Sequence, residues 1–93
     1  MKIKIQNGRL VDYANQLDMT GNIYIAEEKN YKIRKITPNG FVSTLAGSGK
    51  AAAEDGYGTT ASFNIPFGVA VDQFGTLYVA DAQNNKIRKI YQY

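Results

Sequence analysis

The sequence lacks cysteine and histidine altogether, and only 2 of its 93 residues are proline. Without cysteine there is no disulfide framework and no thiolate chemistry, whatever the compartment. Without histidine the chain has neither the commonest general base, nor the usual zinc ligand, nor the usual pH switch. These absences favour a protein that is not an enzyme and that holds no metal and no cofactor.

Long apolar runs are also missing, so no segment qualifies as a membrane span. The first ten residues, MKIKIQNGRL, lack the apolar stretch and the small-residue cleavage site of a signal peptide. We expect a soluble protein without a membrane partner, and the sequence identifies no compartment.

The net charge is low, at +3, and no nucleic-acid recognition motif accompanies the basic residues. A nucleic-acid partner is therefore not expected. What the chain does contain is an ordinary hydrophobic content of 44%, made mostly of Ile, Val, Leu, Tyr and Phe. These residue types favour pleated structure, and the length suits one small all-β domain.

An internal repeat determines the organisation of the chain. The segment DMTGNIYIAEEKNYKIRKIT, starting at Asp18, aligns without gaps with DQFGTLYVADAQNNKIRKIY, starting at Asp72. Ten of the twenty aligned positions are identical, so the chain holds two structural units. The identical pairs are Asp18/Asp72, Gly21/Gly75, Tyr24/Tyr78, Ala26/Ala80, Asn30/Asn84, Lys32/Lys86, Ile33/Ile87, Arg34/Arg88, Lys35/Lys89 and Ile36/Ile90.

Each unit is predicted to be an antiparallel meander of short strands. The turns DMTG and DQFG begin with Asp and end with Gly, which suits a type I turn ending in the left-handed conformation. In KIRKI the two isoleucines are three residues apart and point to opposite faces, so each sheet needs cover on both sides. The predicted strands are 10–17, 22–26, 31–36 and 41–46 in the first unit, and 67–71, 76–80 and 86–91 in the second.

The stretch FNIPFGVAVDQFGTLYVADAQNNKIRKI strongly resembles the NHL repeat, a blade of six-bladed β-propellers. The resemblance covers residues 18–90; residues 10–17 depart from the pattern, and Glu27 stands where the family usually has Asp. It implies an all-β chain with two four-stranded antiparallel blades. The first blade would span 10–46, the linker 47–65, and the second blade, which lacks its own outermost strand, 66–93.

Two blades cannot close a ring, and an open pair exposes broad apolar faces. Three chains would supply six blades, so we expect a propeller closed by a head-to-tail homotrimer. Residues 1–9 contain KIKIQN, which alternates Lys and Ile and is predicted to be a strand that completes a neighbour's second blade. This inter-subunit strand comprises Lys2, Ile3, Lys4, Ile5, Gln6 and Asn7. A frayed tail is the alternative.

A binding site is expected at the end of the blades with the longer polar connections, because loops held by a rigid scaffold carry function. The candidate ligand contacts are Glu27, Glu28, Lys29, Tyr57, Gln83, Asn84 and Asn85, each of which also suits an ordinary loop residue. Arg34 and Arg88 occupy equivalent positions and are expected to form structural ion pairs with Asp72, Asp81 or Glu27.

The leading hypothesis is a non-catalytic, self-assembling propeller scaffold that binds a protein or a glycan at this face. One alternative is a metal-dependent lyase-like or lactonase-like propeller enzyme. Another is an RNA-binding surface, which the acidic residues of the linker end disfavour. An engineered or excised piece of a larger propeller, whose function is self-assembly, also fits the sequence.

Overall fold

The computed structural model describes residues 5–6, 9–10 and 15–92, and within them it is an all-β protein without an α-helix. The strands are β1 (Ile5–Gln6), β2 (Arg9–Leu10), β3 (Asn15–Leu17), β4 (Ile23–Glu27), β5 (Lys32–Ile36), β6 (Val42–Ala46), β7 (Pro66–Val71), β8 (Leu77–Asp81) and β9 (Lys86–Ile90). Two single-turn 3-10 helices, η1 (Gly58–Thr60) and η2 (Ala82–Asn84), lie in the connections.

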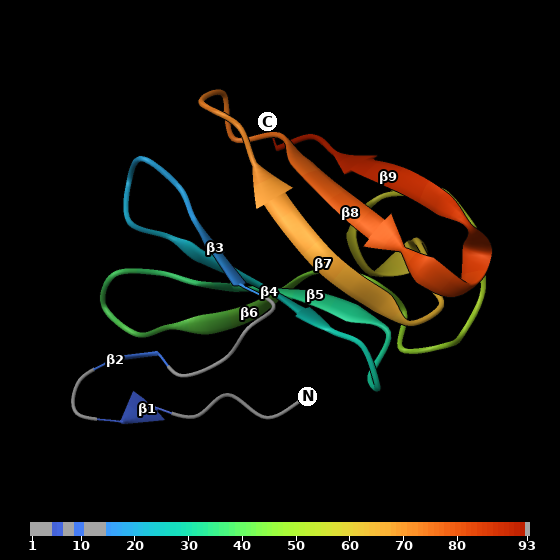
Figure 1. The fold of residues 1–93 in the computed structure, drawn as a ribbon, viewed down its shortest axis with the longest axis horizontal. Coiled ribbons are helices and arrows are strands. Elements are labelled where there is room, and N and C mark those ends of the chain that lie inside the picture. The colour runs from blue at the N-terminus through green and yellow to red at the C-terminus, as the bar shows by residue number, and fades with distance from the viewer. Residues whose placement is uncertain (1–4, 7–8, 11–14, 93) are drawn as a thin grey trace.

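The strands form two antiparallel sheets and a small hairpin (Figure 1). The first sheet has the order β3-β4-β5-β6 and the second sheet the order β7-β8-β9, so both are meanders in chain order. The hairpin pairs β1 with β2, through Ile5 with Leu10 and Gln6 with Arg9. The all-β prediction is confirmed, as is the meander order of the strands within each sheet.

The first predicted strand, 10–17, is wrong as a single element. Arg9–Leu10 belongs to the hairpin, whereas Asn15–Leu17 pairs with β4, and residues 11–14 lie outside the described part of the chain. This is the stretch in which the sequence departs from the repeat, so no second copy defined its register. Of the predicted inter-subunit strand, Lys2, Ile3, Lys4 and Asn7 also lie outside the described residues.

The gap-free repeat is reproduced in the strand register. Tyr24 pairs with Lys35 in the first sheet, and Tyr78 pairs with Lys89 at the same positions of the second. In both sheets the ammonium group lies over the ring of its tyrosine, at 5.9 Å and 5.8 Å from the centroid. Equivalent residues therefore have equivalent cross-strand partners, which is what two copies of one structural unit require.

Both Asp turns have the predicted form. The amide of Gly21 donates to the carbonyl of Asp18, and the amide of Gly75 donates to that of Asp72, at 3.2 Å and 3.1 Å. The two glycines have φ values of +88° and +83°, which a residue with a Cβ rarely adopts. A glycine at the fourth position is therefore needed to reverse the chain without strain.

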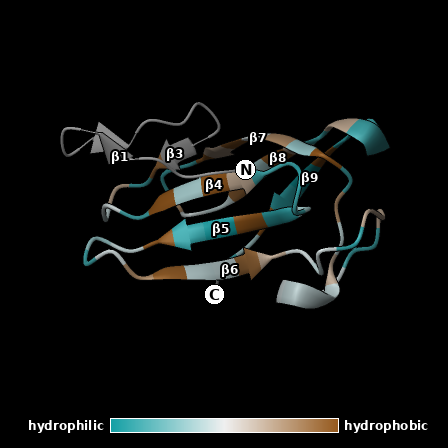
Figure 2. Cartoon of the chain, turned by 90° about the horizontal axis from the view of Figure 1, so that it is seen from below, coloured by the Kyte–Doolittle hydropathy of each residue, from teal (hydrophilic) through white to brown (hydrophobic). Residues whose placement is uncertain are grey.

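The core lies between the two sheets, which are stacked face to face. The first sheet contributes Tyr24, Ala26 and Ile33, and the second contributes Leu77 and Val79, all buried. Phe63 of the linker and Ala46 complete the cluster. Figure 2 shows hydrophobic residues between hydrophilic ones along β5, where Ile33 and Ile36 point to opposite faces. Ile33 is the one that enters this layer.

We predict that Leu77→Ala lowers the free energy of unfolding by about 2–5 kcal/mol, because it leaves a cavity at a fully buried position. Phe74→Ala removes a larger apolar side chain from an exposed turn of the same sheet and should change it by about 0.5 kcal/mol or less. Urea unfolding followed by circular dichroism measures both. Equal losses in the two variants would contradict this placement of the core.

Candidate interaction surfaces

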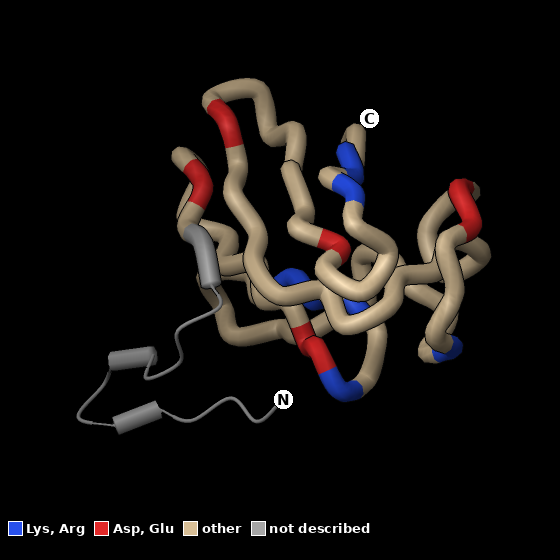
Figure 3. Tube along the Cα trace, turned by 45° about the vertical axis from the view of Figure 1, so that its right-hand side comes forward, with Lys and Arg blue, Asp and Glu red and all other residues tan. Residues whose placement is uncertain are grey.

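The predicted ligand contacts lie at one end of the sheets, where the β4–β5 turn, the β8–β9 turn and the linker gather on the right of Figure 1. Lys29, Tyr57, Gln83 and Asn85 are exposed there, and Glu28 is half-buried. Figure 3 shows acidic and basic segments interspersed along the chain, including at this end. The loop end therefore has mixed charge.

Two of the predicted ligand contacts make hydrogen bonds within the chain. Glu27 is buried and accepts bonds from Arg34 Nε and from Asn30 Nδ2. Asn84 Nδ2 donates to the carbonyl of Ala52 at 2.9 Å and to Asp81 Oδ2 at 2.7 Å. In the structure these side chains therefore hold the loop end together.

Arg88 is the centre of a buried polar cluster in the second sheet. Its Nη1 donates to Asp81 Oδ2 at 2.7 Å and to the carbonyl of Ser62 at 2.9 Å. Its Nη2 donates to the carbonyl of Glu54 and, at 2.8 Å, to the exposed carboxylate of Asp55. Because Ser62, Glu54 and Asp55 belong to the linker, one guanidinium fastens the linker to the sheet.

Asp81 completes this arrangement from the other side. It is fully buried, and its Oδ1 accepts the backbone amide of Asn64 at 2.7 Å. The guanidinium of Arg88 also lies 5.0 Å from the centroid of the Phe63 ring. A buried carboxylate needs a paired cation and hydrogen-bond donors, and here it has both.

The first sheet has a smaller version of the same cluster. Arg34 pairs with Glu27, and Arg34 Nη1 donates to Thr44 Oγ1 of β6 at 2.7 Å. Burial raises the pKa of the Glu27 carboxyl, but the bonds from Arg34 and Asn30 outweigh it and hold the pKa below its ordinary value. The glutamate thus stays ionised opposite its arginine.

Asp72, which the sequence predicted as a partner of the arginines, has a different role. Its Oδ1 accepts the amides of Phe74 and Thr76 at 2.9 Å and 3.0 Å, and its Oδ2 accepts the hydroxyl of Tyr78 at 3.1 Å. Its equivalent Asp18 does the same in the other turn. The prediction was wrong because an Asp at the first turn position lies close to the following backbone amides.

One glutamine connects the two sheets at the turn end. Gln92 Nε2 donates to the hydroxyl of Tyr24 and to the carbonyl of Gly75, both at 2.9 Å. Its Oε1 accepts Lys35 Nζ at 3.1 Å. Sequence reasoning missed this residue, because it lies beyond the repeat and has no counterpart in the first unit.

The outer face of the second sheet is the surface that the repeat singles out. Ile33 is 0% exposed between the sheets, whereas its equivalent Ile87 is 69% exposed. Tyr24 and Ala26 are likewise buried, whereas Tyr78 and Ala80 are half-buried. The residues that make the inter-sheet core in one unit thus lie at the surface in the other.

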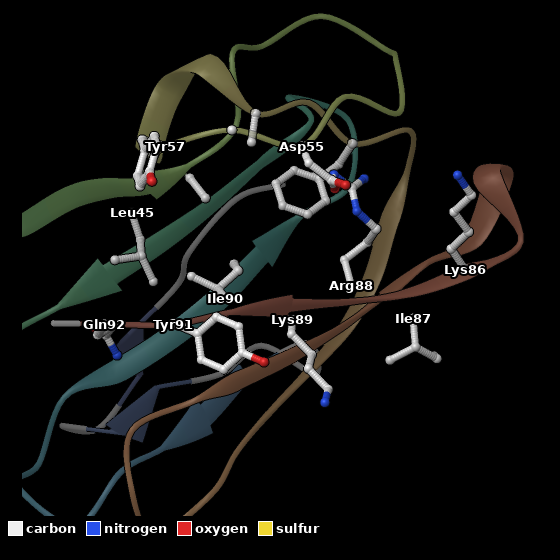
Figure 4. Close-up of a pocket in the computed structure, with 15 residues that line it drawn as sticks. Leu45, Asp55, Tyr57, Lys86, Ile87, Arg88, Lys89, Ile90, Tyr91 and Gln92 are labelled. Carbon is white, nitrogen blue, oxygen red and sulfur yellow. The ribbon is translucent and has the colours of Figure 1, made fainter.

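A groove with a volume of about 820 Å³ follows the edge of β9. It lies between β9, residues 55–58 of the linker, and Leu45 and Ala46 of β6. In Figure 4, Arg88 and Ile90 point to one side of β9, toward Asp55 and Leu45, whereas Ile87 and Tyr91 point to the other. The groove therefore combines a strand edge with an apolar wall.

Among the described residues, no group of three or more acidic side chains is placed to hold a metal ion. No helix in that part of the chain is long and apolar enough to cross a membrane.

No family model matches the chain. It is 44% identical over 71 residues, 75% of its length, to Protein SUPPRESSOR OF QUENCHING 1, chloroplastic, of Arabidopsis thaliana. It is 33% identical over 72 residues, 77% of its length, to NHL repeat-containing protein 2 of Homo sapiens. The chain spans 7% and 10% of the length of these two relatives.

A solved structure shows the same arrangement of strands. It is a structural-genomics protein of unknown function from Bacteroides thetaiotaomicron, which is 37% identical and superposes with a TM-score of 0.77. The match covers 82% of this chain and 20% of that chain. The two-sheet unit therefore also occurs as part of a larger protein.

We predict that Arg88→Met lowers the free energy of unfolding by about 3–5 kcal/mol, because it leaves the carboxylate of Asp81 buried without its cation. The double variant Asp81→Asn/Arg88→Met should be more stable than Arg88→Met, since the buried charge is gone. Lys86→Met, on the exposed end of the same strand, is the control. Chemical denaturation compares all three, and a double variant no better than the single one would refute the explanation.

The Asp18 turn should be sensitive to acid. Burial raises the pKa of the Asp18 carboxyl, but the hydrogen bonds from Asn22, Tyr24 and Thr20 outweigh it and hold the pKa far below its ordinary value. Because the folded-state pKa is the lower one, the stabilisation is present above the unfolded value of about 4 and is lost as the pH falls below it.

Asp18→Asn should therefore cost about 1 kcal/mol of stability at neutral pH, and the difference from the natural protein should shrink in acid. Urea unfolding of both proteins over a pH series measures this, with Glu54→Gln in the exposed linker as the control. A difference that stays constant down to strongly acidic pH would show that the carboxylate is not the stabilising form.

Proposed function

We propose that the chain forms two neighbouring blades of an NHL-type β-propeller and acts as a non-catalytic interaction module. The cross-strand pairs of β4 with β5 are the same, position by position, as those of β8 with β9, which supports the proposal. The similarity to a protein named for its NHL repeats and the structural match within a larger chain support it too. Propeller blades are antiparallel meanders covered on both faces, as the sequence of these sheets demands.

The observation that carries the proposal is the contrast between Ile33 and Ile87. Inside the chain, the Ile33 face of the first sheet is covered by Leu77 and Val79 of the second. In the first sheet, Ile23 and Ile25 occupy the repeat positions that Leu77 and Val79 occupy in the second. Ile23 is half-buried and Ile25 is already 0% exposed in the single chain. A second copy would therefore repeat on the Ile87 face the contact that exists within one chain only after the groups that cover Ile25 move aside.

Such a contact is head-to-tail, because different faces of the two copies meet. With two blades in each chain, three copies would complete a six-bladed ring, which is the assembly expected from the resemblance. The predicted pairing of residues 2–7 with a neighbour's β9 stays a prediction. In the single chain, Ile5 and Gln6 pair with Leu10 and Arg9.

The loop end is the proposed ligand face, with a protein or a glycan as the ligand. Lys29, Tyr57, Gln83 and Asn85 are the exposed members of the predicted set and present an ammonium group, a phenol and two amides. Only Lys29 of these four side chains is charged. The set therefore suits hydrogen bonding and stacking better than binding to a polyanion.

We predict that Ile87→Lys weakens self-association by about ten- to a hundredfold, the effect of withdrawing one buried isoleucine. Light scattering of the natural chain of 10.3 kDa should give a multiple of that mass, and the variant should shift toward the monomer. Phe74→Lys replaces an equally large exposed apolar residue on a turn and should leave the mass unchanged. A natural chain that stays monomeric at all accessible concentrations would overturn the proposal.

A further inference from the structure

The end of the sheets opposite the loop end is rich in exposed apolar side chains. This turn end consists of the β3–β4 turn (18–22), the β5–β6 turn (37–41) and the β7–β8 turn (72–76), on the left and at the top of Figure 1. Among the described residues, nine large hydrophobic side chains are exposed. More than half of them lie in these turns or at the strand ends beside them: Leu17, Met19, Phe41, Val42 and Phe74.

The three turns form one continuous surface. Pro38 of the second turn packs against Gly21 of the first, where an added Cβ would lie 3.3 Å from the proline Cγ. Gln92 joins the first turn to the third, because its Nε2 donates to the hydroxyl of Tyr24 and to the carbonyl of Gly75. Three exposed apolar tips therefore project from the same end of the molecule: Met19, Phe41 and Phe74.

The turn end carries few charges. In the three turns and the two strand positions on either side of each, the charged residues are Asp18, Asp72 and Lys35. Both carboxylates accept hydrogen bonds from their own turns, and Lys35 Nζ donates to Gln92 Oε1. The molecule is thus amphipathic along its strands, because the loop end exposes many charged side chains: Lys29, Lys50, Glu54, Asp55 and Lys86.

The two Asp turns also satisfy most of their own backbone amides. In the first turn, the amides of residues 18, 20, 21 and 22 donate to oxygens of the same turn. In the third turn, the amides of residues 72, 74, 75 and 76 do the same. A partner protein can offer hydrogen bonds to an open backbone, but hydrocarbon cannot, so a tip that enters lipid needs its amides satisfied in advance. The turns therefore favour a lipid surface over a polar partner.

A tyrosine and a lysine lie behind the tips. The hydroxyl of Tyr78 donates to Asp72 at 3.1 Å, and the exposed Lys89 places its ammonium group 5.8 Å from the centroid of the Tyr78 ring. Tyrosine rings are enriched at the boundary between lipid and water, and lysine keeps its charged head in water while its stem lies on apolar surface. Apolar tips backed by these two residue types match the order of layers at a membrane surface.

We propose that the turn end binds the surface of a lipid membrane and inserts its apolar tips, Met19, Phe41 and Phe74, at the boundary between headgroups and acyl chains. Binding depends on buried apolar area and needs no anionic lipid, because the charges of the turns are held by groups of the chain. The expectation of no membrane partner rested on the lack of a spanning segment, which surface binding does not require. The loop end then faces away from the membrane, open to its ligand.

Cosedimentation of the full chain with phosphatidylcholine vesicles tests the proposal. The natural chain should bind, and Phe41→Ser/Phe74→Ser should bind at least about tenfold more weakly, because two apolar tips are lost. Tyr57→Ser/Phe67→Ser is the matched control, since it removes two exposed rings from the loop end, and it should bind like the natural chain. High salt should not release the natural chain, because the contact is not electrostatic.

The same comparison in the Ile87→Lys background separates lipid binding from self-association, so that a change in assembly cannot imitate the loss. Three outcomes overturn the proposal. Vesicles that do not bind the natural chain would leave the turn end to a protein partner. Equal losses in the two double variants would show adhesion of exposed rings without a preferred end. Release by salt would show that the exposed lysines, and not the apolar tips, hold the membrane.

Discussion

The structure depends on one constraint: each sheet is apolar on both faces and cannot leave either face in water at low cost. In the first sheet Ile33 is buried against the second sheet, and Ile36 lies on the opposite face. In the second sheet the same two positions, Ile87 and Ile90, exchange environments, so that Ile90 packs on the core and Ile87 does not. The two sheets of the chain therefore meet through unlike faces, the Ile33 face of the first and the Leu77 face of the second.

The buried Arg88 allows the long polar linker to cross the edge of the apolar core. Arg88 supplies donors to two linker carbonyls, and Asp81 accepts a linker amide. The linker therefore has its backbone groups satisfied where it is buried, and Phe63 can enter the core beside them. The ion pair thus positions the linker, and through it the wall of the β9 groove.

Much of the fold was predictable because the chain contains two copies of one pattern. The alignment of Asp18 with Asp72 located the turns, and the shared KIRKI located β5 and β9 within one residue. Prediction failed in residues 10–17, which depart from the repeat. β6 and β7 were predicted within one residue although they also lie outside the aligned copies, because turns on either side of them were recognisable. Turn residues and β-branched strand residues are local features that the sequence reveals. Gln92 and Asp55, by contrast, act through contacts that depend on how the two sheets and the linker are placed.

The candidate surfaces were predictable only in part for the same reason. The sequence indicated the loop end, but not that Glu27 and Asn84 would be engaged inside it. The sequence indicated that Ile87 and Ile90 lie on opposite faces of their strand. Which of the two is exposed became clear only from the way in which the two sheets stack. The β9 groove depends on the linker path, which is set by Arg88 and which no periodicity encodes.

The exposed Ile87 face has one more consequence. A contact between unlike faces has no internal stop, because each copy that adds presents the same face again. If copies associate through this face as proposed, the rotation between one sheet and the next decides whether they close into a ring or grow into a fibre. Within the chain, Tyr24, Leu77 and Phe63 pack in the layer that sets the two sheets against each other. In such an assembly, repacking these buried residues would change the number of copies without changing the surface through which they meet.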